Sequence, residues 1–301
     1  MSTIVTVTLN PAFDIHCNMK SFVPFSENYI ESTISFVGGK GVNISRALSS
    51  QNVDNLALII LGKENAVSFE KGLKEEGINY RGVYTDERIR ENFTLHCENQ
   101  KETRLSFDSF KAKDSLLDEI LKLVPTNTKF LAFSGRLPSG ISKSKAIEIL
   151  KEIKNRNIFL AVDCNSFNLE ELIEICPYFI KPNEVEISKL SDKPINEVAK
   201  ELHSKGIKHV LITRGNDSSI YAGHNIIKEI KIPVLSPVST VGAGDCTVAG
   251  FLAAYSKGKD IDTCLKTAIA FGSAACLKEG TSAPNKADIE KFIKQTDIIN
   301  I

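Results

Sequence analysis

Short apolar runs alternate with segments whose apolar residues recur at helical spacing. Runs such as 55–61 and 158–162 predict buried strands, and segment 143–155 predicts an amphipathic helix. Expected strands lie at 2–9, 55–61, 128–133, 158–162, 177–180 and 208–213, and expected helices at 40–51, 65–76, 113–123, 143–155, 168–175, 194–205, 243–257, 260–278 and 286–297. Strands that are apolar on both faces and alternate with helices are typical of a mainly parallel sheet with helices on both sides. We therefore expect an α/β fold.

Two stretches break this alternation. Residues 12–36 contain short strands of mixed polarity, such as Tyr29–Val37, and residues 90–107 resemble a hairpin with a polar turn at Asn99-Gln100. Both patterns indicate antiparallel strands with one face in water. Because the chain has no internal repeat and no linker-like stretch, we expect one domain, residues 1–301, in which these two stretches meet as a small β lid.

Composition narrows the class of protein. Thirty-seven basic residues balance thirty-seven acidic ones, whereas a nucleic-acid-binding protein usually has a basic excess. No apolar run approaches the ~18–20 residues of a membrane helix. The first ten residues alternate like a strand and lack the pattern of a signal peptide. We expect a cytoplasmic protein that binds neither nucleic acid nor membrane.

The seven cysteines form no CxxC pair and the five histidines no HExxH pair. This pattern is typical of reduced intracellular thiols and is unfavourable for a structural zinc site.

The strongest chemical signal is Thr240–Cys246, TVGAGDC, which follows a strand-like segment and opens an apolar helix. Glycines at a helix start allow backbone N–H groups to approach an anion, and the helix dipole favours negative charge there. Phosphoryl transfer needs such donors and a carboxylate that deprotonates the attacking hydroxyl. A plain helix start with a stabilising aspartate is the alternative.

A second glycine-rich segment, GGKGVN, joins a strand to a helix at residues 38–43. Lys40 adds a positive charge and Asn43 an amide, although a flexible turn with a solvated lysine would have the same sequence. The segment is not a Walker A loop, and it lacks the third glycine of GxGxxG, which disfavours a dinucleotide-binding dehydrogenase.

Three further segments follow expected strands. In KPNEVE (181–186), Asn183 and Glu186 are spaced to lie on one helical face, where they would hold Mg²⁺ through water or simply cap the helix. Asp14 of NPAFD lies past the carboxyl end of the first strand, where open α/β sheets bind ligands. The segment 213–217, TRGND, is a nucleotide-contacting loop or an ordinary turn.

In this order, the motifs resemble the ribokinase-like (PfkB-type) carbohydrate kinases over essentially the whole chain. The resemblance is carried by LNPAFD, GGKGVN, SGRLPSG (134–140), KPNEVE and TVGAGD. GGKGVN with LNPAFD, and Arg90-Glu91-Asn92, are most similar to the branch of 1-phosphofructokinase, tagatose-6-phosphate kinase and the minor 6-phosphofructokinase. The resemblance implies a three-layer α/β/α fold with a mainly parallel central sheet and a small antiparallel β lid.

The resemblance also implies a role for each matching residue. Asp245 would be the base, and Gly242, Ala243 and Gly244 would form the anion hole. The sugar phosphate would be held by Asp14, Gly39, Lys40, Asn43, Arg90 and Asn92. ATP would be held by Lys181, Asn183, Thr213, Arg214, Gly215, Asn216, Asp217, Ser218, Gly244, Gly272 and Ser273. Glu186 would serve Mg²⁺ through water. Pairing of lid strands between subunits would make a homodimer.

The sequence departs from the family pattern at Arg136, at Ser218, at 163–167 and at Ser106–Phe110, which lacks the usual Pro-Gly.

The expected activity is transfer of the ATP γ-phosphoryl group to a ketohexose phosphate, with fructose 1-phosphate favoured. Tagatose 6-phosphate and fructose 6-phosphate are the next alternatives, followed by an unphosphorylated sugar or nucleoside. The cations Lys40 and Arg90 decide this order, because a phosphate gains charge-assisted bonds from them. A sensor that binds sugar phosphate and nucleotide without turnover is the rival from another class, and the intact Asp245 argues against it.

Overall fold

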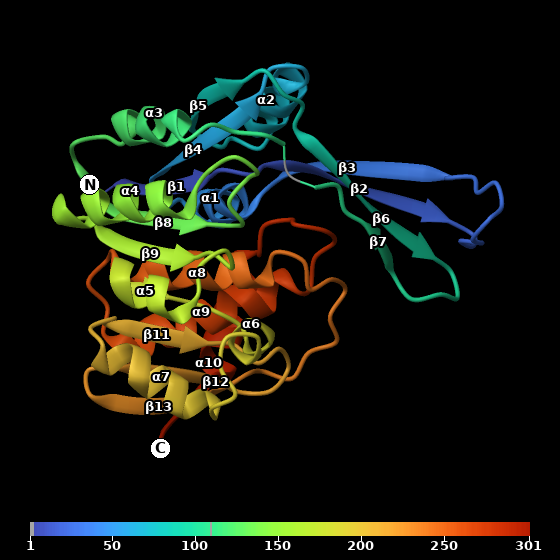
Figure 1. The fold of residues 1–301 in the computed structure, drawn as a ribbon. Coiled ribbons are helices and arrows are strands. Elements are labelled where there is room, and N and C mark those ends of the chain that lie inside the picture. Colours follow the sequence, from blue (N-terminus) through green and yellow to red (C-terminus); the bar gives the residue numbers. More distant parts are fainter. Residues whose placement is uncertain (1–2, 109) are drawn as a thin grey trace.

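The chain forms a ten-stranded sheet between two helical layers, with a four-stranded sheet projecting from one edge (Figure 1). The computed structural model describes residues 3–108 and 110–301. Ser109 lies outside the described residues; it belongs to Ser106–Phe110, a segment in which the sequence departs from the family pattern. The large sheet has the order β14-β13-β12-β11-β10-β9-β8-β1-β4-β5. Its strands are β1 (Thr3–Thr8), β4 (Asn55–Gly62), β5 (Tyr80–Thr85), β8 (Thr128–Ser134), β9 (Phe159–Asp163), β10 (Phe179–Ile180), β11 (His209–Ile212), β12 (Ser219–Gly223), β13 (Ile226–Lys231) and β14 (Asp297–Asn300).

The strands from β5 to β11 in this order pair in parallel, and β12, β13 and β14 add an antiparallel edge. One face packs on α3 (Ser115–Leu123), α4 (Lys143–Asn155), α5 (Leu169–Ile175), α6 (Glu184–Ser188) and α7 (Ile195–Ser204). The other packs on α1 (Lys40–Ser50), α2 (Ala66–Glu75), α8 (Ala243–Tyr255), α9 (Ile261–Ala275) and α10 (Lys286–Gln295). Side chains of β9 are buried throughout, which explains its continuous apolar sequence.

The small sheet, hereafter the lid, has the order β3-β2-β6-β7. Its strands are β2 (Ala12–Met19), β3 (Ser32–Gly38), β6 (Arg90–Cys97) and β7 (Thr103–Leu105). The pairs β2·β3 and β6·β7 are antiparallel, as expected, whereas β2 and β6 pair in parallel. The reason is topological: β2 follows β1 and β6 follows β5, and both leave the same edge of a parallel sheet in the same direction (Figure 1).

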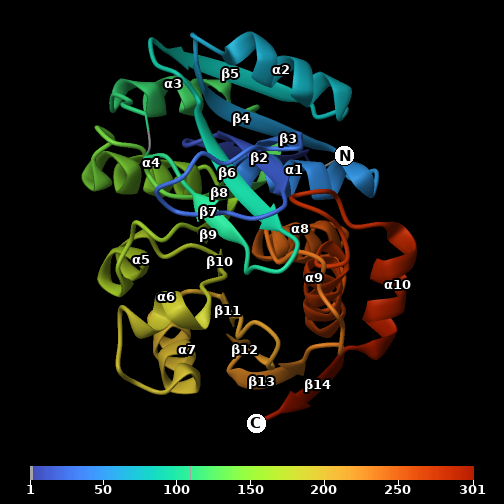
Figure 2. The same cartoon turned by 90° about the vertical axis from the view of Figure 1, so that its right-hand side faces the viewer.

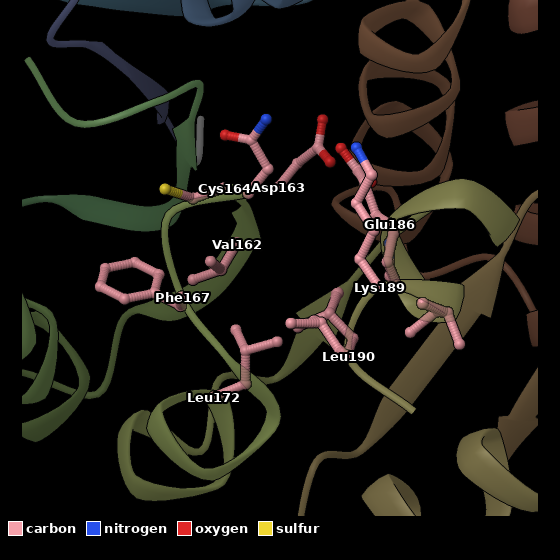
Figure 3. A pocket seen from close by; sticks show the side chains of 12 residues that line it. Val162, Asp163, Cys164, Phe167, Leu172, Glu186, Lys189 and Leu190 are labelled. Carbon is pink, nitrogen blue, oxygen red and sulfur yellow. The ribbon is translucent and has the colours of Figure 1, made fainter. Parts of the chain in front are cut away.

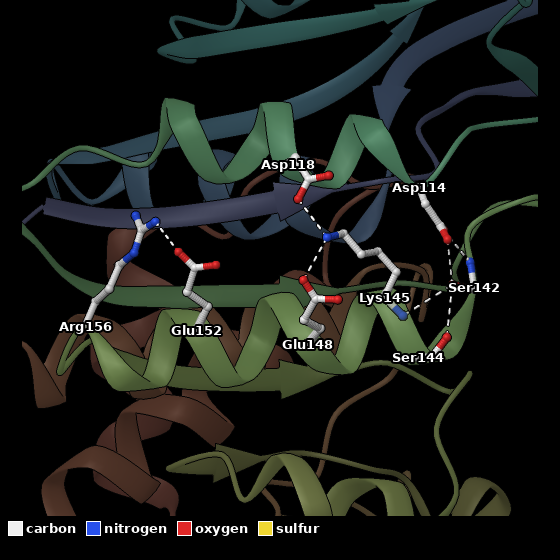
Figure 4. Close-up of polar contacts among 8 residues, drawn as sticks. All are labelled: Asp114, Asp118, Ser142, Ser144, Lys145, Glu148, Glu152 and Arg156. Atoms are coloured by element: carbon white, nitrogen blue, oxygen red, sulfur yellow. Dashed lines mark hydrogen bonds and ion pairs between the residues drawn. The ribbon is translucent and has the colours of Figure 1, made fainter.

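Polar contacts tie α3 to α4 on the outer face of the molecule (Figure 4). Ser142 caps α4 by accepting a bond from Lys145 N at 3.2 Å, and its hydroxyl donates to Asp114 Oδ2 at 2.7 Å. Lys145 Nζ lies 2.8 Å from both Asp118 Oδ1 and Glu148 Oε1. These contacts fix the start of α4 directly after the segment 134–140.

The α/β fold with a mainly parallel sheet and a lid sheet is confirmed, but the edge strands were not expected. The strands β5, β12, β13 and β14 were missed, and the helix expected to end at 297 ends at Gln295. The strand-like segment 232–240 contains no strand. Pro233 and Pro237 have no N–H for a strand ladder, which explains this difference. Within the described residues, no helix has the length and apolarity needed to cross a membrane.

Candidate active site

The predicted site residues lie at the edge of the large sheet where the parallel strands end. Asp163 ends β9, Lys181 follows β10 and Thr213 follows β11, while Asp14 lies near the start of the lid strand β2, beyond the end of β1. The α8 helix begins at the same edge, close to the lid base, where the strands β2 and β6 start (Figure 2). Parallel strands bring their carboxyl ends together, so segments far apart in sequence meet here.

Gly242 and Ala243 start α8. Gly242, the N-cap, has a φ of 76°, a left-handed conformation that favours glycine. The first helical hydrogen bond is the one that Cys246 N donates to Gly242 O at 2.9 Å. The N–H groups of Gly244 and Asp245 come before it and take no part in the hydrogen bonds within the helix. The Ala243 N–H lies 3.4 Å from Thr240 O and is partly used. The helix start therefore offers an anion its backbone donors.

Asp245 lies in the first turn of α8 and is 6% exposed. Asn43 Nδ2 on α1 donates to its Oδ2 at 2.7 Å. Burial raises the pKa of Asp245 to about 6, while Lys40, Asn43 and Lys181 favour the carboxylate. A carboxylate whose pKa lies close to neutrality is suited to accept a proton.

Two lysines share the carboxylate of Asp163 near the start of α8. Lys40 Nζ lies 3.2 Å from Oδ2, and Lys181 Nζ lies 3.6 Å from Oδ1. Burial disfavours charge on Asp163 and Lys40, but their attraction to opposite charges lowers the pKa of Asp163 and raises that of Lys40. A Cβ placed on Gly244 would lie 3.1 Å from Lys181 Nζ, so this amine lies beside the anion-binding turn.

The lid base carries the remaining residues predicted for the sugar. Asn92 Nδ2 donates to Asp14 Oδ1 at 3.0 Å across the β2·β6 pair. Arg90 donates to Pro11 O at 3.4 Å and to Phe107 O at 3.3 Å. Gly39, the N-cap of α1, has a φ of 118°, and a Cβ there would lie 2.6 Å from Thr8 Cγ2.

The structure does not bring Lys40 and Arg90 onto one partner. Lys40 is bound to Asp163 near Asp245, whereas Arg90 lies at the start of β6. The second cation near Arg90 is Arg136, which pairs with Asp108 at 2.5 Å, next to the Phe107 carbonyl that Arg90 binds.

An open cleft of about 770 Å³ lies between α6 and the helices α8 and α9. Most residues predicted for ATP line it: Lys181, Asn183, Thr213, Arg214, Gly215, Asn216, Gly244, Gly272 and Ser273. Asp217 and Ser218 are not part of its lining. Ser218 instead contacts Arg214 and Glu229 through its hydroxyl, and Arg214 Nε donates to Ser218 O at 3.0 Å, which stabilises the turn.

Asn183 and Glu186 form a reciprocal capping box at the start of α6. Asn183 Oδ1 accepts from Glu186 N at 2.8 Å, and Glu186 Oε2 accepts from Asn183 N at 2.9 Å. The helix-capping alternative from the sequence is therefore realised. Glu186 also lines the large cleft. No cluster of three or more His, Cys, Asp or Glu suited to a metal occurs within residues 3–108 and 110–301.

A smaller cavity of about 210 Å³ lies beside the large cleft, between β9, α5 and α6 (Figure 3). Apolar side chains, among them Phe167 and Leu172, line its interior, and Asp163 and Glu186 lie at its rim. Asn165, Glu186 and Lys189 line both cavities. Its apolar lining and small volume distinguish it from the large cleft.

Sequence reasoning assigned no role to Asp163 or Arg46. Asp163 directly follows the predicted strand 158–162, as other candidates follow their strands, and this position was an available signal. Arg46 Nη1 donates to Asn43 Oδ1 at 2.7 Å. Its role depends on contacts with residues distant in sequence, which no local pattern reveals.

Comparison with known proteins gives a family match over most of the chain. The model of the pfkB family carbohydrate kinases matches residues 8–288. A 1-phosphofructokinase of Borreliella burgdorferi is 30% identical, with 99% of each chain covered. A tagatose-6-phosphate kinase of Staphylococcus epidermidis is 26% identical, covering 99% of this chain and 100% of the relative.

Solved structures match the fold at lower identity. Phosphofructokinase-2 from Escherichia coli, in complex with potassium, has a TM-score of 0.90 at 22% identity, covering 98% of this chain and 99% of that one. Ribokinase from Thermotoga maritima has a TM-score of 0.79 at 20% identity, covering 98% of this chain and 100% of that one. At these identities the likeness concerns the fold alone.

Proposed function

The chain belongs to the pfkB family of carbohydrate kinases, and we propose that it transfers the γ-phosphoryl group of ATP to a ketohexose phosphate. Fructose 1-phosphate is the favoured substrate, which would give fructose 1,6-bisphosphate. The full-length match to a 1-phosphofructokinase supports this choice. The full-length match to a tagatose-6-phosphate kinase makes tagatose 6-phosphate the second candidate, followed by fructose 6-phosphate.

The observation that carries the proposal is the position of Asp245. Its carboxylate contacts Asn43, which belongs to the glycine segment beside the lid, at 2.7 Å. The residue before it, Gly244, lines the 770 Å³ cleft. Asp245 thus lies between a site for the acceptor and a site for the donor, as in-line transfer requires.

In this mechanism, Asp245 accepts the proton of the attacking sugar hydroxyl. The N–H groups at the start of α8 donate to the oxygens of the transferred group. Lys40 and Lys181, held by Asp163, add positive charge beside these donors. Positive charge preorganised in a buried site stabilises the transition state more than charge in water does.

ATP binds in the 770 Å³ cleft, with Lys181 and Gly244 next to its phosphates. Gly272 and Ser273, on α9, line another part of the same cleft.

Magnesium is the expected metal, and it would neutralise phosphate charge when bound. The chain offers Glu186 as a hard oxygen donor at the cleft but no cluster of ligands within the described residues, which fits an ion held by phosphates and water. Glu186→Gln is expected to raise the Mg²⁺ concentration for half-maximal rate, and an unchanged titration would exclude the role.

The existing phosphate of the substrate is placed near Arg90 at the lid base. Arginine binds phosphate through two parallel N–H bonds, which a neutral sugar does not require. Arg136 adds a second guanidinium close by. Lys40 is assigned to the transferred group instead, because Asp163 holds it near Asp245.

A coupled assay of ADP release tests the proposal. Fructose 1-phosphate, tagatose 6-phosphate, fructose 6-phosphate and their unphosphorylated parents are compared at equal concentrations. We expect turnover with at least one of the phosphates and the highest kcat/KM with fructose 1-phosphate. ADP release with none of the phosphates would refute the proposed substrate class.

We further propose that the protein acts as a cytoplasmic homodimer joined through the lid. Seven cysteines are free, which fits a reducing compartment. Seven of the sixteen large apolar side chains that are exposed in the described residues lie on the lid or its connections: Val23, Phe25, Tyr29, Ile30, Ile34, Leu105 and Phe107. Such a concentration of exposed apolar groups is typical of an interface.

A further inference from the structure

We infer that Arg46 is a positioning residue of the reaction centre, because it fixes the amide of Asn43 in the orientation that donates to Asp245. This inference rests on the proposed function, in which Asp245 is the base. It concerns a residue three positions beyond Asn43 on α1, one helical turn away.

Arg46 is a buried cation with partners on several elements. It is 7% exposed, and its Nε donates to Glu76 Oε2 at 2.5 Å. Nη1 donates to Asn43 Oδ1 at 2.7 Å and lies 3.4 Å from Thr281 O, while Nη2 donates to Val37 O. The guanidinium therefore has a fixed position between the end of α2, the lid strand β3 and the segment after α9.

The chemistry of the two side chains determines how Asn43 must lie. A guanidinium only donates hydrogen bonds, so the amide can face Arg46 only with its oxygen. Its nitrogen then faces Asp245, and Nδ2 donates to Oδ2 at 2.7 Å. The reversed amide would place its NH₂ group against Arg46 and its oxygen against the carboxylate, which is unfavourable at both ends.

The orientation of Asn43 affects how readily Asp245 gives up its proton. The groups that act on Asp245 are Lys40 on α1, Asp163 at the end of β9 and Lys181 after β10, besides Asn43. Burial and Asp163 raise the pKa of Asp245 to about 6, and the bond from Asn43 opposes them. Without Arg46, the amide rotates freely and this opposing bond weakens, so Asp245 holds its proton to higher pH.

The experiment compares profiles of kcat/KM against pH for wild type, Arg46→Met and Arg46→Lys. The substrate is the ketohexose phosphate with the highest wild-type activity. We expect the acid limb of the wild type near pH 6 and that of Arg46→Met about one pH unit higher, because a hydrogen bond to a charged group is worth about one to two pKa units. At pH 9 the variant recovers to within about tenfold of wild type, since Asp245 is then ionised in both.

Arg46→Lys covers the case in which the methionine variant does not fold. Its single ammonium stays with the carboxylate of Glu76 and leaves the amide of Asn43 without its donor, so the acid limb again moves upward. Ser45→Ala is the matched control, because Ser45 is a buried neighbour on α1 whose hydroxyl bonds Thr6 Oγ1 at 2.8 Å. We expect this control to lose stability without a displaced limb.

The outcomes separate the inference from the proposed function. If the wild type phosphorylates a ketohexose phosphate and a folded Arg46→Met or Arg46→Lys enzyme has its acid limb at the wild-type pH, Arg46 is only a structural residue and the inference is wrong. If the wild type phosphorylates none of these sugars, the proposed function fails, whatever the variants do.

Discussion

At the scale of single residues, the burial of Asp245, the proposed base, carries a cost in stability. Its pKa is raised from 3.8 to about 6 by burial, so the folded chain binds this proton more tightly than the unfolded chain does. Ionisation of Asp245 therefore destabilises the fold. The effect grows as the pH rises from about 4 to about 6 and is constant above that range.

Asp245→Asn is expected to lower turnover by ~10²–10⁴-fold, because an amide cannot accept the hydroxyl proton. The same variant should unfold at higher urea concentration, with a gain of about 1–3 kcal/mol at pH 8 and roughly half that at pH 5. Steady-state kinetics and urea titrations at the two pH values measure both effects. Wild-type turnover in the variant would exclude Asp245 as the base.

Arg90→Ala is expected to lower kcat/KM for the sugar phosphate by about one to two decades, since it removes charge-assisted bonds worth roughly 1.5–3 kcal/mol each. The KM for ATP should change little, because Arg90 does not line the 770 Å³ cleft. Lys101→Ala, a substitution in the turn of the same hairpin, is the control.

Equal losses for a sugar phosphate and its unphosphorylated parent would contradict a phosphate-binding role for Arg90. An unchanged kcat/KM for both would make Arg90 a lid residue that only binds the carbonyls of Pro11 and Phe107.

The structure brings together those candidate residues whose motifs follow strands. Asp14, Lys181 and Thr213 reach one edge because strand order brings them there. The Lys40–Asp163–Lys181 cluster was not predicted, because an ion pair depends on which side chains face each other across strands. The roles of these residues stay predictions until the variants are measured.

At the scale of elements, the hydroxyl of Ser142 links the start of α4 to the segment before α3. Ser142 accepts from Lys145 N and donates to Asp114 Oδ2, so it joins the cap of α4 to the segment before α3 (Figure 4). Ser142→Ala is expected to lower the free energy of unfolding by about 1–2 kcal/mol, measured by urea denaturation. Ser144→Ala, two residues on in the first turn of α4, removes only an exposed bond of 3.2 Å to Ser142 Oγ and should change it by less than about 0.5 kcal/mol.

The elements that sequence patterns predicted best are those with one dominant period. The strand 55–61 is apolar from Leu56 onward and the helix 143–155 is amphipathic, and both occur within one residue of their expected bounds. The strands β12 and β13 are joined by His224 and Asn225, which have φ values of 51° and 59°. Two-residue hairpin turns of this kind usually contain glycine, and this one does not, which explains why the hairpin was missed.

At the scale of the whole molecule, the exposed apolar groups of the lid predict an assembly. If the proposed dimer forms through the lid, Phe25→Asp is expected to convert it to a monomer, because a charge is unfavourable inside an apolar interface. Light scattering after size-exclusion chromatography measures the change. Val67→Asp is the control, since Val67 is exposed on α2, outside the lid.

A wild-type protein that is monomeric at assay concentration would refute the lid-mediated dimer. An unchanged dimer in Phe25→Asp would move the interface away from this part of the lid.

The contact between Asn43 and Asp245 joins residues that are 202 positions apart in sequence. During synthesis from the N-terminus, the lid and the glycine segment leave the ribosome long before the base does. A chain that stops short of α8 lacks Asp245 and the glycine turn that precedes it. An incomplete chain is therefore expected not to consume ATP, because Asp245 and the turn before it lie in about the last fifth of the 301 residues.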